Sequence, residues 1–179
     1  MIVLVGFMGA GKTTVGRLLG AGLGLPFADL DVLIEGGRSR SIKSIFAEEG
    51  EAAFRDIEHQ ALAAALAGPD RVLALGGGAV EHPGSRRLLT PARVVYLHVD
   101  YAEALGRVGG DAGRPMLARP DLADVYRRRL AGYAEVATLT VLTGGRAAKQ
   151  VCDDVLTGLA GLPAGDPASY PHQDGIRPS

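Results

Sequence analysis

The chain has little cysteine, little net charge and no long apolar run. Cys152 is the single cysteine among 179 residues, so no disulfide can form within the chain. The apolar start at Met1 lacks a basic segment and runs into glycines, unlike a secretory signal. We therefore expect a cytoplasmic protein. Gly, Pro or a charged residue interrupts every hydrophobic run within about ten positions, which is too short to span a bilayer.

The net charge of −1 argues against two further kinds of partner. Nucleic acids and acidic membrane surfaces are bound through a strong positive field, which this composition does not supply. We therefore expect a small-molecule partner, no nucleic acid and no membrane, and we take a monomer as the default.

The length and the hydrophobic fraction of 47% are sufficient for one compact domain, which we place at residues 1–160. Residues 161–179 carry four prolines and almost no apolar periodicity, so we expect a disordered tail.

Short apolar runs bounded by Gly, Pro or Asp recur along the chain and predict strands. Apolar residues at i, i+3, i+4 spacing predict a helix over 52–67, and a final helix is expected over 147–159. Strands that are apolar throughout, each separated by helix, are typical of a parallel sheet covered on both faces. The fold class is therefore α/β with three layers. The predicted strands are residues 2–5, 26–29, 72–75, 94–99 and 139–142.

A phosphate-binding loop follows the first predicted strand. The pattern Gly6-x-x-x-x-Gly11-Lys12-Thr13 has P-loop spacing and precedes a helical run over 14–22, which is the context that this motif requires. Its backbone N–H groups would converge on phosphate oxygens, Lys12 would reach the β- and γ-phosphates, and the Thr13 hydroxyl would bind Mg²⁺. Because just three of the 19 basic residues are lysines, chance does not explain this one. The expected ATP contacts in the loop are Gly9, Ala10, Gly11, Lys12, Thr13 and Thr14.

Two carboxylates, Asp29 and Asp31, lie where the second predicted strand ends, and the i, i+2 spacing of a strand would aim both the same way. One can hold Mg²⁺ while the other accepts a proton from an attacking hydroxyl. A lone Asp at a strand end is often a turn former or a helix cap, but beside a P-loop the functional interpretation is favoured.

Arg55 and Glu58 are three residues apart on the predicted helix over 52–67. They could form a weak surface ion pair. Alternatively, Glu58 orients the Arg55 guanidinium for a two-point contact with a ligand carboxylate. Three glycines, Gly76, Gly77 and Gly78, end the third strand, where missing side chains either let a ligand approach the backbone or leave a mobile loop.

Five motifs follow one another along residues 2–156. They are Gly-Phe-Met-Gly-Ala-Gly-Lys-Thr-Thr from Gly6, Asp29-Leu-Asp31, Ile45-Phe-x4-Gly50-Glu51-x2-Phe54-Arg55-x2-Glu58, Gly76-Gly-Gly-Ala-Val80 and Arg114-Pro115. In this order they resemble the shikimate kinase family, which is similar in fold to nucleoside monophosphate kinases. The resemblance implies a five-stranded parallel sheet of order 2-3-1-4-5. It also implies Mg²⁺-dependent transfer of the ATP γ-phosphate to the 3-hydroxyl of shikimate, in the pathway to aromatic amino acids.

The resemblance also assigns roles. Asp31 would contact the reacting hydroxyl, Arg55 would bind the substrate carboxylate beside the wall of Gly76, Gly77 and Gly78, and Asp29 would join Thr13 near the metal. Phe46 and Phe54 would either line the substrate ring or belong to the core. Arg114, in a lid over residues 109–120, would close over the phosphates.

Three further arginines are assigned by the same resemblance. Arg107 and Arg146 would lie on the adenine side, although Arg146 follows a Thr-Gly-Gly run where the family has a proline-containing loop. Arg129 would be the second arginine for the substrate carboxylate. The family places that arginine before a Pro-x-Tyr, here Ala131 and Tyr133, and the segment from the lid is about four residues short, which is roughly one helical turn. The neighbouring Arg127 and Arg128 remain alternatives.

Other functions stay open at this point. Another small-acid kinase, such as a gluconate kinase, could use the same arginines. A nucleotide acceptor is less expected, because 5% aromatic residues provide no obvious set for base stacking. A P-loop domain that binds ATP without turnover is the alternative from a different class.

Overall fold

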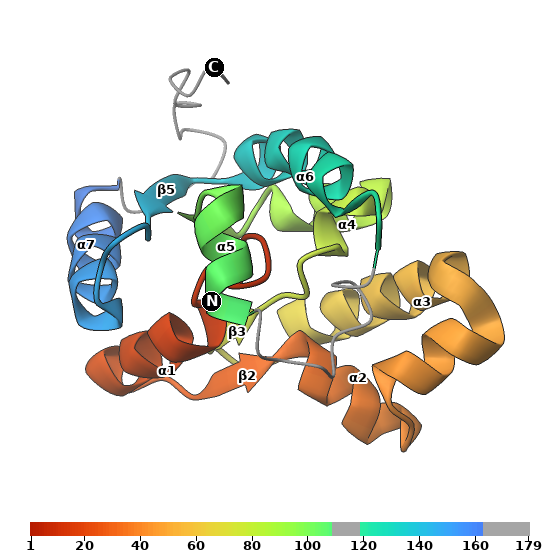
Figure 1. The fold of residues 1–179 in the computed structure, drawn as a ribbon. Helices are drawn as coiled ribbons and strands as arrows, with labels where there is room; N and C mark the ends of the chain where they lie inside the picture. Colours follow the sequence, from red (N-terminus) through yellow and green to blue (C-terminus); the bar gives the residue numbers. More distant parts are fainter. Residues whose placement is uncertain (109–118, 163–179) are drawn as a thin grey trace.

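The computed structural model describes residues 1–108 and 119–162 (Figure 1). The lid predicted over 109–120 therefore lies almost entirely outside the described residues, as does most of the expected tail over 161–179. The described elements are β1 (Ile2–Val5), α1 (Lys12–Leu23), β2 (Phe27–Asp29), α2 (Leu30–Arg38), α3 (Ile42–Leu66), β3 (Val72–Ala74), the 3₁₀ turn η1 (Ala79–Glu81), α4 (Pro83–Leu89), β4 (Arg93–His98), α5 (Tyr101–Val108), α6 (Leu122–Val136), β5 (Leu139–Leu142) and α7 (Ala148–Gly161).

The five strands form one sheet in the order β2-β3-β1-β4-β5, and every described pair is parallel. All five predicted strands are confirmed, with ends that differ by at most one residue. In the register, Ile2 pairs with Val72 on one side and with Arg93 on the other. The carboxyl ends of β1, β3 and β4 consequently meet at one edge, where ligands bind in open α/β sheets.

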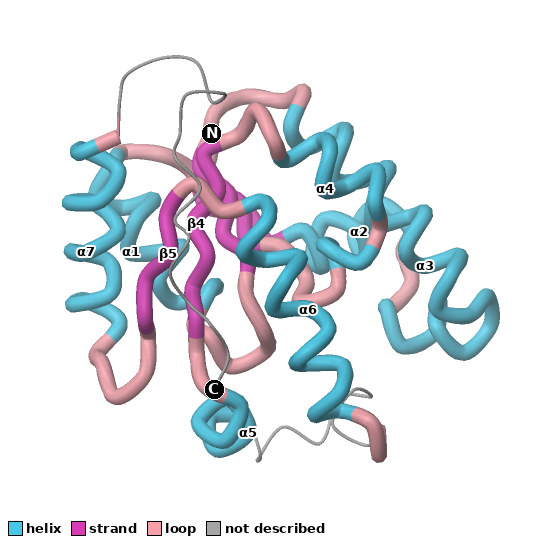
Figure 2. Tube along the Cα trace, turned by 90° about the horizontal axis from the view of Figure 1, so that it is seen from above, coloured by secondary structure: helices cyan, strands magenta, loops and turns pink. Residues whose placement is uncertain are grey.

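Helices cover both faces of the sheet. Figure 2 shows α1 and α7 on one side of the strands and α4 and α6 on the other. β1 and β3 are apolar throughout and buried along their whole length because both faces of the sheet are covered. The predicted three-layer α/β class is confirmed. Within residues 1–108 and 119–162, no helix combines the length and the apolar character needed to cross a membrane.

Helix α3 begins ten residues before the start of the predicted helix. The Ser41 side chain accepts the Ser44 N–H at 3.1 Å and so caps the new start. Gly50, with φ 84° and ψ 172°, bends the helix in its first half. Because this bend interrupts the apolar periodicity, the pattern over 52–67 does not extend to the start of the helix at Ile42. After the bend, Arg55 and Glu58 lie on a face that packs toward the glycines after β3.

The strand β2 stops at Asp29, and α2 starts at Leu30. The Asp29 carboxylate accepts the Asp31 N–H at 3.1 Å, so Asp29 is the helix cap and Asp31 lies in the first helical turn. The strand-pleat argument for these two acids is therefore wrong. They come to the same edge of the sheet through a strand-to-helix turn instead.

Candidate active site

The loop after β1 has the backbone of a phosphate cradle. Gly9 has φ 77°, and a Cβ there would lie 2.6 Å from the Ala104 carbonyl oxygen. Gly11 has φ 86° and forms the cap of α1 without a side chain of its own. The first hydrogen bond of α1 runs from the Val15 N–H to the Gly11 carbonyl, so the N–H of Thr13 has no acceptor within the helix. These donors and the helix dipole face an incoming anion.

Lys12, Thr13 and Asp29 lie together beside this loop. The Lys12 ammonium donates to the carbonyls of Gly6 at 2.8 Å and Phe7 at 3.1 Å, which holds the side chain over the loop. The Thr13 hydroxyl donates to the Asp29 carboxylate at 3.2 Å. A hydroxyl and a carboxylate at this distance are hard oxygen donors of the kind that Mg²⁺ prefers. In the described part of the chain no three His, Cys, Asp or Glu side chains gather as a metal site, so a cation here would also need oxygens from a nucleotide.

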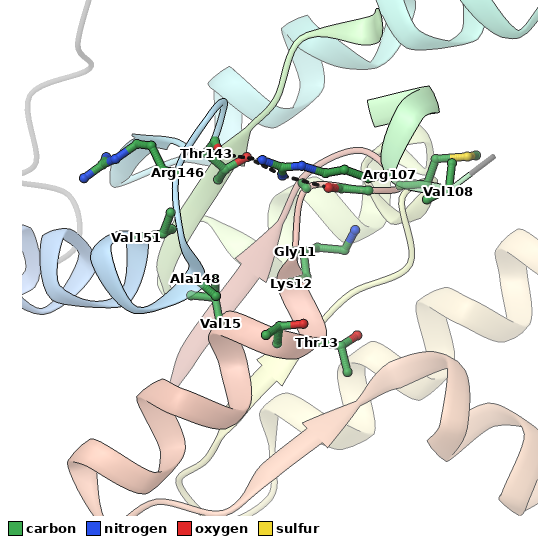
Figure 3. A pocket seen from close by; sticks show the side chains of 14 residues that line it. Gly11, Lys12, Thr13, Val15, Arg107, Val108, Thr143, Arg146, Ala148 and Val151 are labelled. Atoms are coloured by element: carbon green, nitrogen blue, oxygen red, sulfur yellow. Dashed lines mark hydrogen bonds between the residues drawn. The ribbon is translucent and has the colours of Figure 1, made fainter. Parts of the chain in front are cut away.

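A pocket of about 410 Å³ opens next to the loop. Figure 3 shows Arg107 from α5 reaching across it toward Thr143. The Arg107 guanidinium donates to the Gly9 carbonyl at 3.0 Å and to the Thr143 carbonyl at 2.6 Å. Arg107 therefore fixes the loop against the segment after β5. The other residues that line the pocket include Met8, Gly9, Ala10, Gly11, Lys12, Thr13, Thr14, Val108, Arg146, Ala148 and Val151.

Arg146 also lines this pocket, but its guanidinium points away from Lys12 (Figure 3). It donates to the Leu142 carbonyl at 3.2 Å and pairs with Asp154 at 2.5 Å. Its aliphatic part thus forms a wall of the pocket while its charge is held by α7.

On the other side of Lys12, two carboxyl groups approach Gly76. A Cβ on Gly76 would lie 2.7 Å from Asp31 Oδ1 and 2.7 Å from Glu58 Oε1, so no other residue fits without moving them. Burial, with a smaller contribution from the Asp29 charge, raises the pKa of Asp31 to about 6. Burial also raises the pKa of Glu58 to about 7, although Arg55 opposes this shift. Asp31 is thus poised to take a proton near neutral pH.

Arg55 lies against Gly78. A Cβ on Gly78 would be 2.2 Å from Arg55 Nη2, so the missing side chain makes room for the guanidinium. Glu58, which is 1% exposed, accepts from Arg55 Nη1 at 2.7 Å, and Glu51 accepts from Nη2 at 3.2 Å. The weak surface pair considered above is therefore excluded: Glu58 is buried and orients the guanidinium. The backbone of Gly76 and Gly78 packs directly against the side chains of Glu58 and Arg55.

Helix α6 brings Arg129 to the same wall. Arg129 is 3% exposed and donates to Glu81 at 2.6 Å, while a Cβ on Gly77 would lie 3.6 Å from Arg129 Nη1. The neighbours Arg127 and Arg128 point outward, with exposures of 71% and 58%. Of the three candidates, Arg129 alone shares the glycine wall with Arg55. Its position on the helix gave a usable signal, because it falls on the apolar stripe of Leu122, Val125, Tyr126, Arg129, Tyr133 and Val136.

Phe46 and Phe54 form one aromatic pair with ring centroids 4.6 Å apart. Phe54 is buried, whereas Phe46 is partly exposed. The Arg55 guanidinium lies 5.3 Å from the Phe54 ring and 5.9 Å from the Phe46 ring. Phe54 therefore belongs to the core, and Phe46 packs against the core while part of its side chain stays exposed near Arg55.

Sequence reasoning missed the acidic partners of these arginines. Glu81 pairs with Arg129 and lies 3.4 Å from Arg55, and Glu51 links Arg55 to Arg119 at 3.1 Å. The pairs of Glu81 with Arg55 and Arg129 and of Glu51 with Arg119 join residues far apart in the chain, so no local pattern could reveal them. Glu51 and Arg55, in contrast, have the i, i+4 spacing of a helical ion pair, which was a usable local signal. Arg114 lies outside the described residues.

The fold and the site together define a P-loop phosphotransferase for a small acceptor. A phosphate loop, a nucleotide-sized pocket and two arginines, of which Arg129 is buried and Arg55 is partly exposed, lie along one edge of a parallel sheet. A family model described as shikimate kinase matches residues 8–160. The chain belongs to the shikimate kinase family.

Individual relatives agree with this assignment. The chain is 47% identical over 161 residues to a shikimate kinase of Mycobacterium tuberculosis, with 88% of this chain and 92% of the relative covered. It is 46% identical over 159 residues to that of Streptomyces coelicolor, covering 87% and 93%. Among solved structures, a shikimate kinase from Acinetobacter baumannii in complex with shikimate has a TM-score of 0.85 at 38% identity, covering 89% of this chain and 92% of that one.

Proposed function

We propose that this protein transfers the γ-phosphoryl group of ATP to the 3-hydroxyl of shikimate, with Mg²⁺ as cofactor. The observation that carries the proposal is the pair of arginines, Arg55 and Arg129. Both guanidinium groups converge on the carboxylate of Glu81 beside the triple-glycine wall. A carboxylate-bearing acceptor fits this arrangement, and membership of the shikimate kinase family supports shikimate as that acceptor.

The donor half of the site is the loop and its pocket. The loop N–H groups and Lys12 would bind the phosphates, and the pocket between Arg107 and Ala148 would take the nucleoside. Thr13 and Asp29 would hold Mg²⁺, which supplies positive charge to the phosphate oxygens when bound.

The acceptor half supplies position and a base. With the substrate carboxylate held by Arg55 and Arg129, its reacting hydroxyl would lie near Asp31. The hydroxyl oxygen forms a bond to the γ-phosphorus, the bond from that phosphorus to the bridging oxygen of ADP breaks, and the hydroxyl proton passes to Asp31. Charge stabilisation and alignment therefore provide most of the rate enhancement. Arg114 remains a proposed phosphate contact from the sequence alone.

The test is ADP release in a coupled assay with shikimate, ATP and Mg²⁺. We expect ADP formation to depend on shikimate and to be far slower with gluconate, a carboxylate-bearing polyol of different shape. If gluconate is phosphorylated faster than shikimate, shikimate is not the acceptor and the proposal is wrong on this point. ATP binding without turnover on either acid would favour a non-catalytic domain instead.

A further inference from the structure

Glu81 occupies the point at which the two proposed substrate arginines meet. It ends η1, directly after the glycine wall, and its Oε2 lies 2.6 Å from Arg129 Nη2 and 3.4 Å from Arg55 Nη2. Its other oxygen, Oε1, lies 3.7 Å from Nη2 of Arg128. One side-chain carboxylate thus contacts both guanidinium groups that the proposed function assigns to the carboxylate of the acceptor.

The charges explain why a carboxylate lies there. Arg129 is nearly fully buried, and burying an unpaired cation is strongly unfavourable. Arg55 has Glu58 as a close partner, whereas within residues 1–108 and 119–162 Arg129 pairs with no carboxylate other than Glu81. Glu81 is therefore the counterion that lets Arg129 stay charged in this position.

The two arginines retain unused hydrogen-bonding capacity. The Nε atoms of Arg55 and Arg129 are both buried, and neither has a hydrogen-bond partner among the described residues. A guanidinium offers five donors in a planar fork; Arg55 shares its fork among Glu58, Glu51 and Glu81, whereas Arg129 has Glu81 as its one carboxylate partner among the described residues. Two guanidinium groups that share one carboxylate, with donors left unpaired, form a site whose charge suits an anion.

We propose that Glu81 is an internal counterion that an acceptor carboxylate must displace from Arg129 and Arg55. This inference rests on the proposed function for the identity of the acceptor. If Glu81 and an acceptor carboxylate both stayed, two like charges would share a partly buried site. Glu81 is 26% exposed and already close to the exposed Arg128, which can receive it when it swings outward.

The exchange would make the site selective. A neutral polyol brings no charge to compensate Arg129, so it cannot take the place of Glu81. A carboxylate acceptor replaces one ion pair by another. Its apparent affinity is reduced only because Glu81 occupies the two arginines in a fraction of the molecules. If Glu81 leaves the site in about one molecule in ten, the apparent affinity for the acceptor is reduced about 10-fold.

The test compares Glu81→Gln with wild type and with Glu135→Gln as a matched control. Glu135 lies on α6, the same helix as Arg129, but outside this site, where it pairs with Arg86 at 3.1 Å. Calorimetric titration with shikimate should give a Kd that is about 3- to 10-fold lower for Glu81→Gln and unchanged for Glu135→Gln. The KM for shikimate should fall likewise, while the KM for ATP, which binds at the phosphate loop away from Glu81, should stay within about twofold. An unchanged or weaker affinity of Glu81→Gln would overturn the inference, because Glu81 would then support the arginines.

A second probe does not depend on the acceptor. Sodium acetate, compared with NaCl at the same ionic strength, should raise the melting temperature of Glu81→Gln more than that of wild type or Glu135→Gln. An equal rise in all three proteins would also refute displacement. If shikimate is neither bound nor phosphorylated, the proposed function fails while acetate still tests Glu81. Should Glu81→Gln not fold, Glu81→Asp, whose carboxylate is one methylene shorter, should show the same direction of effect.

Discussion

Replacing Asp31 by asparagine should slow the reaction and stabilise the protein. The amide has nearly the shape of the carboxylate, but it cannot accept the hydroxyl proton. Loss of a general base typically reduces rates about 10²- to 10⁴-fold. We therefore expect kcat to fall by at least about 100-fold, with little change in the KM for ATP.

The stabilisation follows from the raised pKa of Asp31. In the folded chain this pKa is about 6, against an ordinary value of 3.8, so at pH 8 the folded protein holds an ionised carboxylate in unfavourable surroundings. A shift of this size corresponds to about 3 kcal/mol at most. Because the side chain keeps some contact with water, we expect about 1 to 2 kcal/mol, or a melting temperature roughly 2–8 °C higher for Asp31→Asn.

The pH dependence has a definite sign. The folded state binds the extra proton, so wild type is relatively most stable below pH 3.8 and loses that contribution as the pH rises through about 6. The advantage of Asp31→Asn should therefore be largest at pH 8 and shrink toward pH 4. Thermal melts in EDTA keep cations away from Asp29 during this comparison. A variant with unchanged kcat, or with no gain in stability at pH 8, would refute the role given to Asp31.

Three further predictions concern the two halves of the site. Arg55→Ala should raise the KM for shikimate about 10- to 100-fold, because charge-assisted hydrogen bonds are lost, and leave the KM for ATP unchanged; equal effects on both substrates would contradict this. Gly78→Ala should displace the Arg55 guanidinium and raise the KM for shikimate about 10-fold, whereas Gly22→Ala, which has open space around it, should not. Asp29→Asn keeps a helix-capping oxygen but should raise the Mg²⁺ concentration for half-maximal rate about 10-fold or more; unchanged Mg²⁺ dependence would remove Asp29 from the metal site.

The sheet and the phosphate loop could be predicted because local patterns specify them. Strands buried on both faces are apolar at every position, and the loop requires glycine at fixed spacing before Lys12 and Thr13. The side of α6 that faces the site could also be predicted, since Arg129 lies at helical spacing from buried residues such as Val125 and Tyr133.

Other features depend on contacts that no short pattern contains. Asp31 enters a helix because the Asp29 carboxylate caps it, and the same two residues could equally have continued a strand. Glu81 and Arg129 are 48 positions apart in the sequence and form an ion pair only because α6 packs beside η1. The bend at Gly50 likewise breaks the periodicity that would have revealed the start of α3. Tertiary packing decided each of these.

The central claim is transfer of a phosphoryl group to shikimate rather than hydrolysis of ATP. Phosphorus NMR of a reaction with ATP, Mg²⁺ and shikimate distinguishes the two, because a phosphate ester of a secondary alcohol gives a resonance split by one carbinol proton. We predict that this ester appears as the γ-phosphate signal of ATP disappears, in equal amounts. Formation of inorganic phosphate and ADP without the ester would contradict the account.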